Sequence, residues 1–387
     1  MAPHYQHLLE ATGSLGTPLA VVDADALWAN ADDLARRAHG VPIRVASKSV
    51  RVRSVIERTL ELEAFAGVMS YSLAESNWLV DHGAPDVLLA YPTVDAAALR
   101  DLVDDERRTA AITLMIDSIE ALDVIDSMLD ISRPEIRVCL DVDASLRIGP
   151  VHLGVRRSPV HTVDEATRIA QMISGRAGFR LVGLMFYDAQ IAGLPDSSAG
   201  VRLVKKRSAA ELTERRGQIV KAVRHVAPLE IVNAGGTGSL EVTGADPAIT
   251  ELTAGSGLFA PSLFDGYDAF KARPAAFFAL SVVRRPAADI ATVFSGGYIA
   301  SGATHKNRRP TPVWPEGLAL IDAEGAGEVQ TPLKGAAARD LAVGDRVLMR
   351  HAKAGEMCER FDEVVLVAAD GSVERLPTYR GEGKNFG

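Results

Sequence analysis

The chain has 387 residues, of which 47% are hydrophobic and 24% charged, a composition typical of a globular protein large enough for two domains. Its formal net charge of −8 excludes a generally basic surface of the kind that nucleic acids and anionic membranes attract, and basic runs such as VKKRS and HKNRRP are short. No apolar run approaches the roughly 20 residues of a membrane helix. We therefore expect a small-molecule partner, no nucleic acid and no membrane.

The cysteine content and the first residues bear on the compartment. Two cysteines, Cys139 and Cys358, are too few for a disulfide framework and favour a reducing cytoplasm. The first 18 residues show no basic segment followed by an apolar one, so we expect no secretory signal.

Between residues 19 and 258, short apolar runs alternate with amphipathic segments of helical period, such as VRSVIERTLELE (52–63). Eight runs are strand-like: IRVASK (43–48), AGVMSY (66–71), DVLLAYP (86–92), AAITLMID (110–117), EIRVCLDVD (135–143), LVGLMFY (181–187), LEIVNAGG (229–236) and ITELTAGSG (249–257). Continuous apolar runs are typical of parallel strands that are covered on both faces. The pattern predicts an α/β fold, a (β/α)₈ TIM-type barrel over residues 19–272.

A doubly wound open sheet is the main alternative to the barrel. Such a sheet concentrates its site at one switch point, whereas here polar and glycine residues follow many strands, which favours the barrel. After Pro274 the helical period disappears, and short β-type runs separated by Gly, Asp and Pro follow. We therefore predict a C-terminal all-β domain over residues 273–387, and an N-terminal segment, 1–18, packed with it.

Barrel enzymes place their active sites at the C-terminal ends of the strands. By that rule, the candidate active-site residues in the sequence are Lys48, Tyr71, Tyr91, Asp117, Asp141, Asp143 and Tyr187. Desolvation lowers the pKa of a lysine and lets it form a Schiff base with a carbonyl. The alternative, a lysine that ends a strand in water, is the more common outcome when Lys48 is considered alone.

Two loops of small residues shift that balance. NAGGTGS (233–239) follows the seventh barrel strand, and TAGSG (253–257) follows the eighth. Such loops leave backbone N–H groups free for an anion, and the loops after strands 7 and 8 are the usual phosphate site of barrels. The dinucleotide fingerprint, by contrast, lies in a first βαβ unit. Together with a lysine after the first strand, these loops suggest a phosphorylated aldehyde cofactor, pyridoxal 5′-phosphate.

With these motifs in place, the chain resembles the fold-type III pyridoxal-phosphate enzymes, which combine an alanine-racemase-like barrel with a C-terminal β domain. Within them it is most similar to the D-threonine aldolase and D-serine dehydratase group. The resemblance rests on six stretches in this order: TPLAVVDADALWAN, IRVASKS, DVDASLRIG, GLMFYDAQ, NAGGTGS and ELTAGSG.

The resemblance implies a role for each matched residue. Lys48 would be the Schiff-base lysine, Arg147 would lie near the phenolic oxygen of the cofactor, and Tyr187 beside its ring. Thr253 would meet the pyridine nitrogen. The phosphate would be held by the two loops, through Asn233, Gly235, Gly236, Thr237, Gly238, Gly255 and Ser256. The implied activity is that of a lyase on a D-configured β-hydroxy amino acid, by retro-aldol cleavage or by dehydration, in a homodimer.

Two departures from the group concern its histidines and its metal. Ala46 and Val50 stand where the group usually has histidines around the lysine. The group also binds a divalent metal through a late histidine and a Cys or Asp two residues on. Here His351 is kept, but Lys353 follows it, and a protonated lysine is a poor ligand.

The nearest substitutes for the second metal ligand are Cys358, which would suit zinc, and Glu356, which would suit a harder ion such as Mn or Mg. Alternatively, His351 is a general base or a hydrogen-bonding residue that holds no metal.

Other activities stay open at this point. An amino-acid racemase would need a second base, for which Tyr298 is a candidate. A non-catalytic pyridoxal-phosphate carrier is a further alternative, although the β domain argues against it. The segment HKNRRPTPVWP (305–315) matches no expected motif and could bind a substrate carboxylate, contact a neighbouring subunit, or form a plain surface loop.

Overall fold

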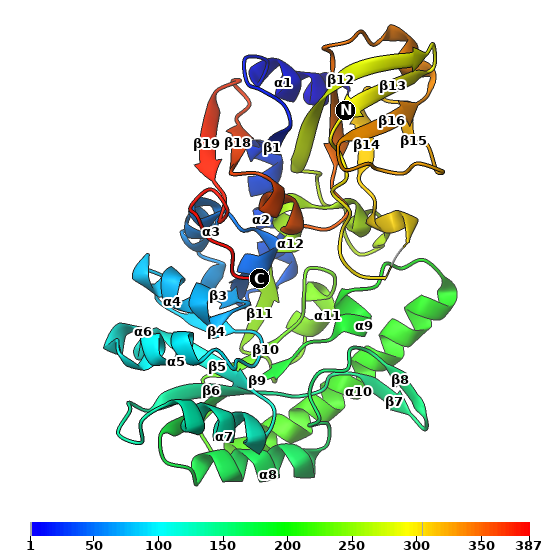
Figure 1. Ribbon diagram of the computed structural model, residues 1–387. Coiled ribbons are helices and arrows are strands. Elements are labelled where there is room, and N and C mark those ends of the chain that lie inside the picture. The colour runs from blue at the N-terminus through cyan, green and yellow to red at the C-terminus, as the bar shows by residue number, and fades with distance from the viewer. Residues whose placement is uncertain (1, 304) are drawn as a thin grey trace. The chain divides into compact units, whose positions relative to one another are not determined.

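The computed structural model describes residues 2–303 and 305–387 (Figure 1). The chain forms two compact units. One, here called the β unit, contains residues 1–33, 48–56 and 256–385, and the other, the barrel unit, contains residues 34–47, 57–255 and 386–387. Within the described part of the chain, no helix has both the length and the apolar character needed to cross a membrane.

The barrel unit contains eight parallel strands that close on themselves in the order β10-β11-β2-β3-β4-β5-β6-β9. The strands are β2 (Ile43–Ala46), β3 (Phe65–Ser70), β4 (Val87–Leu89), β5 (Ile112–Ile116), β6 (Ile136–Asp141), β9 (Phe179–Phe186), β10 (Ile231–Ala234) and β11 (Glu251–Ala254). Each lies within one of the eight apolar runs or overlaps it, so the prediction of a TIM-type barrel is confirmed. A small antiparallel hairpin, β7 (Leu146–Ile148) with β8 (Val151–Leu153), follows β6.

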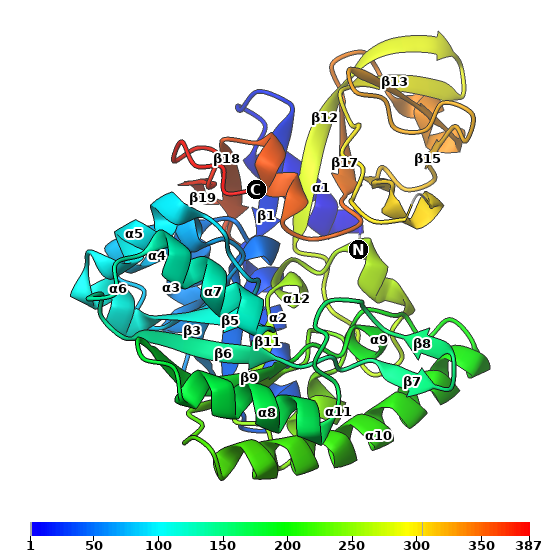
Figure 2. The same cartoon turned by 60° about the horizontal axis from the view of Figure 1, so that its bottom comes forward.

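Helices connect the barrel strands and lie outside them, as Figure 2 shows for α4 to α8. They are α4 (Leu73–Asp81), α5 (Ala96–Val103), α6 (Glu106–Ala111), α7 (Ile119–Met128), α8 (Val163–Ser174), α9 (Ala189–Ala192), α10 (Ala199–Arg224) and α11 (Leu240–Gly244). Ser72 caps the N-terminus of α4, because its hydroxyl accepts a hydrogen bond from the backbone N–H of Glu75. Two further helices, α2 (Ala24–Arg37) and α3 (Arg53–Leu60), have residues in both units.

The barrel interior has an apolar layer and a charged one. The apolar layer takes one side chain from each of six strands: Met69, Leu88, Met115, Cys139, Met185 and Ile231. The charged layer centres on Arg44, which is 1% exposed and donates to Glu251 at 2.7 and 2.8 Å and to Asp86 at 2.7 Å. A buried guanidinium is tolerated only when it is paired in this way.

The β unit is built on a nine-stranded sheet. Its strands are β1 (Leu19–Asp23), β12 (Ala276–Ala287), β13 (Ile290–Phe294), β14 (Thr311–Trp314), β15 (Ala319–Leu320), β16 (Gln330–Lys334), β17 (Arg346–Arg350), β18 (Glu363–Val367) and β19 (Val373–Pro377), and its helices include α1 (Ala2–Ala11) and α12 (Ser256–Phe259). Tyr5 of α1 packs edge-on against Phe277 in the core beneath the sheet, with ring centroids 5.5 Å apart.

Strand β1 belongs to this sheet, whereas the sequence pattern grouped residues 19–23 with the barrel. It pairs antiparallel with β12 and parallel with β18. All five of its residues are buried. A short, fully buried run has the same appearance in either kind of sheet, so its partners cannot be read from its composition.

Candidate active site

Lys48 lies two residues beyond β2, in a 3₁₀ turn, Ser47–Ser49. Ser47, which precedes it, is buried. The Ser47 hydroxyl donates a hydrogen bond of 3.1 Å to the backbone carbonyl of Met69, near the end of β3. This bond ties the end of β2 to the neighbouring strand of the barrel. The chain therefore leaves the barrel interior at a fixed point, and Lys48 follows directly.

Within the β unit, the backbone of Lys48 packs against Gly355. A Cβ added to Gly355 would lie 1.9 Å from the Lys48 carbonyl oxygen, and Gly355 has φ +90°. Glycine is required there on both grounds. Arg51 donates to the same carbonyl from Nε at 3.2 Å and forms an ion pair with Glu359. The turn that carries Lys48 is thus joined to the segment after β17, which begins with His351.

The two glycine loops close tightly against their surroundings in the barrel unit. Gly235 has φ +83°, in the left-handed region. A Cβ on Gly236 would lie 2.9 Å from the Cβ of Ala192, and a Cβ on Gly255 would lie 2.5 Å from the backbone oxygen of Ala46. The loops after β10 and β11 therefore bring bare backbone to the barrel's C-terminal end, which is what a bound phosphate group requires.

Asp188 anchors the first of these loops, and sequence reasoning did not select it. It is fully buried, accepts a hydrogen bond from the Thr243 hydroxyl at 2.7 Å, and lies 3.2 Å from the Ser239 hydroxyl. Ser239 Oγ also accepts from the backbone N–H of Gly236 at 3.2 Å. Burial raises the pKa of Asp188, while the charge of Arg216 and these hydroxyls oppose the rise. The only sign of Asp188 in the sequence was its position directly after GLMFY, at the end of a predicted barrel strand.

The predicted cofactor residues Asn233 and Thr253 are hydrogen-bonded to each other. Asn233 Nδ2 donates to Thr253 Oγ1 at 2.8 Å and to Glu251 at 2.7 Å, and Thr253 Oγ1 donates to Asn233 Oδ1 at 3.0 Å. Because Glu251 also pairs with Arg44, one network runs from the charged layer of the barrel to Thr253. This network fixes the hydroxyl that the resemblance assigns to the pyridine nitrogen.

Tyr187 lies next to the first glycine loop. A Cβ on Gly236 would lie 3.9 Å from Tyr187 Cε2. The guanidinium of Arg157 lies over the Tyr187 ring at 4.9 Å and over the Tyr91 ring at 5.5 Å. Sequence reasoning missed Arg157, since its only signal was the pair of arginines in GVRRS.

Two carboxyls end the neighbouring strands β5 and β6. Burial raises the pKa of Asp141 to about 7; the charge of Arg157 opposes this rise, and Asp117 and Asp143 add to it. Burial also raises the pKa of Asp117. The sequence implied that Asp117 and Asp141 lie close together, because both follow neighbouring barrel strands. It did not indicate that Arg157 lies near Asp141.

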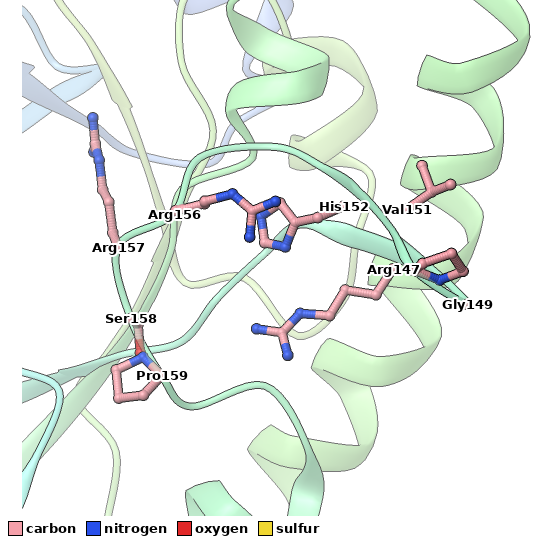
Figure 3. A pocket seen from close by; sticks show the side chains of 9 residues that line it. Arg147, Gly149, Val151, His152, Arg156, Arg157, Ser158 and Pro159 are labelled. Atoms are coloured by element: carbon pink, nitrogen blue, oxygen red, sulfur yellow. The ribbon is translucent and has the colours of Figure 1, made fainter.

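Arg147, on β7, is paired with Asp143. Its Nη2 donates to Asp143 Oδ2 at 2.5 Å and its Nε to the same oxygen at 3.1 Å. Burial would raise the pKa of Asp143, but hydrogen bonds from Ser145 and the Arg147 guanidinium outweigh it and lower the pKa. Arg147 also lines a pocket of about 500 Å³, shown in Figure 3.

His351, immediately after β17, is buried and 2% exposed. Its Nδ1 lies 3.1 Å from the carbonyl oxygen of Ala276, which can only accept, so Nδ1 carries the proton. Its Nε2 is buried and has no hydrogen-bond partner among the described residues. Burial, reinforced by the charge of Arg350, lowers the pKa of His351 to about 4. The ring is therefore a neutral base near pH 7 with an unused acceptor.

The residues near His351 do not fit a divalent metal. Burial raises the pKa of the Cys358 thiol to about 12, so without a metal the thiol is protonated near pH 7. The Glu356 carboxylate is occupied by the backbone N–H and hydroxyl of Ser301, and lies 3.5 Å from the Lys353 ammonium. Across residues 2–303 and 305–387, no three His, Cys, Asp or Glu side chains cluster as metal ligands would.

The candidate second base of a racemase, Tyr298, is packed inside the β unit. Its ring meets those of Phe278 and Phe361 edge-on, with centroids 4.8 and 5.4 Å away, and its hydroxyl is hydrogen-bonded to Ser295 at 2.9 Å. In the 305–315 segment, residues 311–314 form β14, and Lys306 pairs with Asp322 at 2.6 Å.

The barrel-unit residues fit the phosphate and the ring of pyridoxal phosphate. Gly236 and Gly255 lie where a side chain would meet the protein itself, so both loops need glycine there, and the Gly236 N–H is bonded to Ser239 Oγ. Tyr187 borders the same loop, and the paired side chains of Asn233 and Thr253 end the adjacent strands. Lys48 follows the strand next to β11.

Solved structures with this fold superpose on nearly the whole chain. D-threonine aldolase from Filomicrobium marinum matches with a TM-score of 0.80 at 22% identity, covering 95% of this chain and 96% of that one. D-threo-3-hydroxyaspartate dehydratase from Delftia sp. HT23 matches with a TM-score of 0.75 at 21% identity, covering 94% and 98%. Alanine racemase from Clostridium difficile 630 matches with a TM-score of 0.63 at 16% identity, covering 95% and 100%.

Among curated proteins, no relative matches the sequence. At these identities the structural likenesses show the shared fold, and the family comes from the sequence itself. The model of the alanine racemase N-terminal domain family matches residues 22–260, more than half of the chain. The chain therefore belongs to this family of fold-type III pyridoxal-phosphate enzymes.

Proposed function

We propose that this protein is a pyridoxal-phosphate-dependent lyase that acts on a D-configured β-hydroxy amino acid. The observation that carries the proposal is the state of His351: it is buried, neutral, and held by Nδ1 so that its Nε2 can accept a proton. Retro-aldol cleavage of a β-hydroxy amino acid requires a base for that hydroxyl, and a neutral imidazole with a free Nε2 can serve as that base. Two of the matched structures are enzymes named for D-threonine cleavage and for D-threo-3-hydroxyaspartate dehydration.

The cofactor, when bound, supplies an electron sink for the bond that breaks. In this proposal the Lys48 amine holds the cofactor covalently, and the loops after β10 and β11 bind its phosphate through backbone N–H groups. Thr253, fixed by Asn233, contacts the pyridine nitrogen, and Arg147 contacts the phenolic oxygen. His351 Nε2 would take the proton of the substrate's β-hydroxyl in a retro-aldol cleavage; in a dehydration it would pass the proton released from the α-carbon to the departing hydroxyl, which leaves as water.

The metal that the resemblance implies is left out of this proposal, because Cys358 and Glu356 do not fit it. The racemase is the runner-up. The hydrogen bond and ring packing of Tyr298 give it no support as a second base. A homodimer and a cytoplasmic location remain part of the proposal, the latter because both cysteines are free and buried.

The test is an activity assay on the holoprotein with D-threonine and D-serine, each with and without a chelator. Glycine plus an aldehyde would identify cleavage, and a keto acid plus ammonia would identify dehydration. We expect one of these product pairs, undiminished by the chelator, and a rate at least a hundredfold lower in His351→Asn, as for a lost general base. Interconversion of D- and L-alanine without either product pair would overturn the lyase in favour of the racemase.

A further inference from the structure

Three neighbouring strands of the barrel unit, β10, β11 and β2, carry a row of polar side chains that ends at Thr253. Side chains two positions apart on a strand point to the same face of the sheet, so Glu251 and Thr253 of β11 share one face. In the strand register, Asn233 of β10 lies opposite Glu251, and Arg44 of β2 lies opposite Thr253. The pairing of these strands therefore brings the polar side chains together.

Glu251 is the branch point of this row. Its Oε1 accepts hydrogen bonds from Arg44 Nε at 2.8 Å and from Asn233 Nδ2 at 2.7 Å, and its Oε2 accepts one from Arg44 Nη2 at 2.7 Å. The two bonds from the guanidinium hold the carboxylate in one orientation. Asp86 also accepts a hydrogen bond from Arg44 Nη2, at 2.7 Å. Within the described part of the chain, however, only Glu251 joins Arg44 to Asn233.

The Glu251 carboxylate decides which way the Asn233 amide faces. A carboxylate oxygen can only accept a hydrogen bond, so the amide atom beside it must be the donor, Nδ2. One hydrogen of Nδ2 goes to Glu251, and the other reaches Thr253 Oγ1 at 2.8 Å. The Thr253 hydroxyl in turn donates its own proton to Asn233 Oδ1 at 3.0 Å. The donor and the acceptor that meet this hydroxyl are therefore both fixed by the contact between Asn233 and Glu251.

We propose that Glu251 is a positioning residue for the cofactor, which acts through Asn233 to aim the Thr253 hydroxyl at the ring nitrogen. The hydroxyl would exchange Asn233 Oδ1 for the ring nitrogen and keep the hydrogen bond from Nδ2. Hydrogen bonds to the ring nitrogen tune the electronic properties of the cofactor. This inference rests on the contact between Thr253 and the ring nitrogen in the proposed function, but not on which reaction the enzyme catalyses.

A purely structural role for Glu251 would be to neutralise Arg44, a role that it shares with Asp86. A matched pair of variants separates the two roles. Glu251→Gln and Asp86→Asn each remove one carboxylate charge from the same buried guanidinium. Only Glu251→Gln changes the group that Asn233 meets, because a neutral amide no longer forces Nδ2 toward position 251.

The first experiment records the ring-nitrogen resonance of pyridoxal phosphate that is labelled with nitrogen-15 and bound to the full-length protein. Thr253→Val removes the hydroxyl and should move this resonance. Glu251→Gln and Asn233→Ala should move it in the same direction, whereas Asp86→Asn should leave it at the wild-type position. A resonance that moves in Thr253→Val but not in Glu251→Gln would overturn the proposal, and so would an equal displacement in Asp86→Asn. A resonance unchanged in Thr253→Val would overturn the contact on which the proposal rests.

The second experiment measures the affinity of the apoprotein for pyridoxal phosphate by titration. Glu251→Gln and Thr253→Val should each weaken binding by about threefold to tenfold, as for one lost hydrogen bond. The double variant should bind no more weakly than Thr253→Val, because Glu251 acts only through that hydroxyl. Losses that add in the double variant would overturn the proposal. A wild type that binds no pyridoxal phosphate would overturn the cofactor and this inference together, whereas missing lyase products with the expected resonances would overturn the lyase alone.

Discussion

Replacing the buried imidazole of His351 should change how stability depends on pH. The ordinary pKa of a histidine is 6.5, and burial lowers that of His351 to about 4. Between pH 6.5 and pH 4, the His351 side chain binds a proton in the unfolded chain but not in the folded protein. The contribution of His351 to stability is therefore fully present above pH 6.5 and is lost as the pH falls through 6.5 toward 4.

The magnitude follows from the size of this shift. A lowering of about 2.5 pH units is worth about 3.4 kcal/mol in total at about 1.4 kcal/mol per unit, of which about 2 kcal/mol is lost between pH 7 and pH 5. His351→Asn keeps a donor for the carbonyl of Ala276 and removes the titration. The assay is urea unfolding of wild type and variant across this pH range.

The expected quantity is the difference between the two unfolding free energies, which should shrink by about 2 kcal/mol from pH 7 to pH 5. The difference is needed because Asp141, whose pKa is raised to about 7, changes stability with pH in the opposite direction. Its effect is the same in wild type and variant, so it cancels when one free energy is subtracted from the other. His225→Asn, at an exposed position after α10, is the matched control and should follow the wild type. Parallel curves for wild type and His351→Asn would refute the assignment of a buried neutral imidazole.

Three further substitutions test the barrel unit. Asp188→Ala should weaken cofactor binding by tenfold or more, because the hydroxyls of Ser239 and Thr243 lose a buried acceptor; a pyridoxal-phosphate titration followed by absorbance checks this. Gly255→Ala should also weaken cofactor binding, since its Cβ would lie 2.5 Å from a backbone oxygen, whereas Gly217→Ala, in open space on α10, should leave binding unchanged. Arg44→Met should destabilise the protein by about 3–5 kcal/mol in urea unfolding, because it leaves Glu251 buried without its partner; an unchanged midpoint would contradict the buried ion pair.

The barrel was predictable because its strands are fully buried and therefore read as continuous apolar runs separated by helical periods. The glycine loops could also be predicted, because runs of small residues after the seventh and eighth strands stand out in the sequence. The close backbone contacts in the structure explain why these residues are small. The partners of β1 were not, because five buried residues fit either sheet. Arg157 and Asp188 were missed for another reason: their significance lies in contacts with residues 30 to 66 positions away, which no local pattern records.

The metal site shows a different limit of sequence reasoning. His351, Glu356 and Cys358 contain the right atoms at a plausible spacing. Their surroundings give a metal no support: Ser301 donates two hydrogen bonds to the Glu356 carboxylate, and the Cys358 thiol is buried. Burial also lowers the pKa of His351, which keeps the imidazole neutral near pH 7 and makes it a weaker base than a free histidine.

The role of Lys48 is the central claim, and the absorbance spectrum of the purified protein tests it most directly. Spectra would be recorded with and without borohydride, for the wild type and for Lys48→Ala, after incubation with pyridoxal phosphate. We expect a visible absorption band in the wild type that borohydride abolishes, with the cofactor then found covalently on the peptide that contains Lys48, and no such band in the variant. A colourless wild type that takes up no pyridoxal phosphate, or a variant with the same band, would contradict the account.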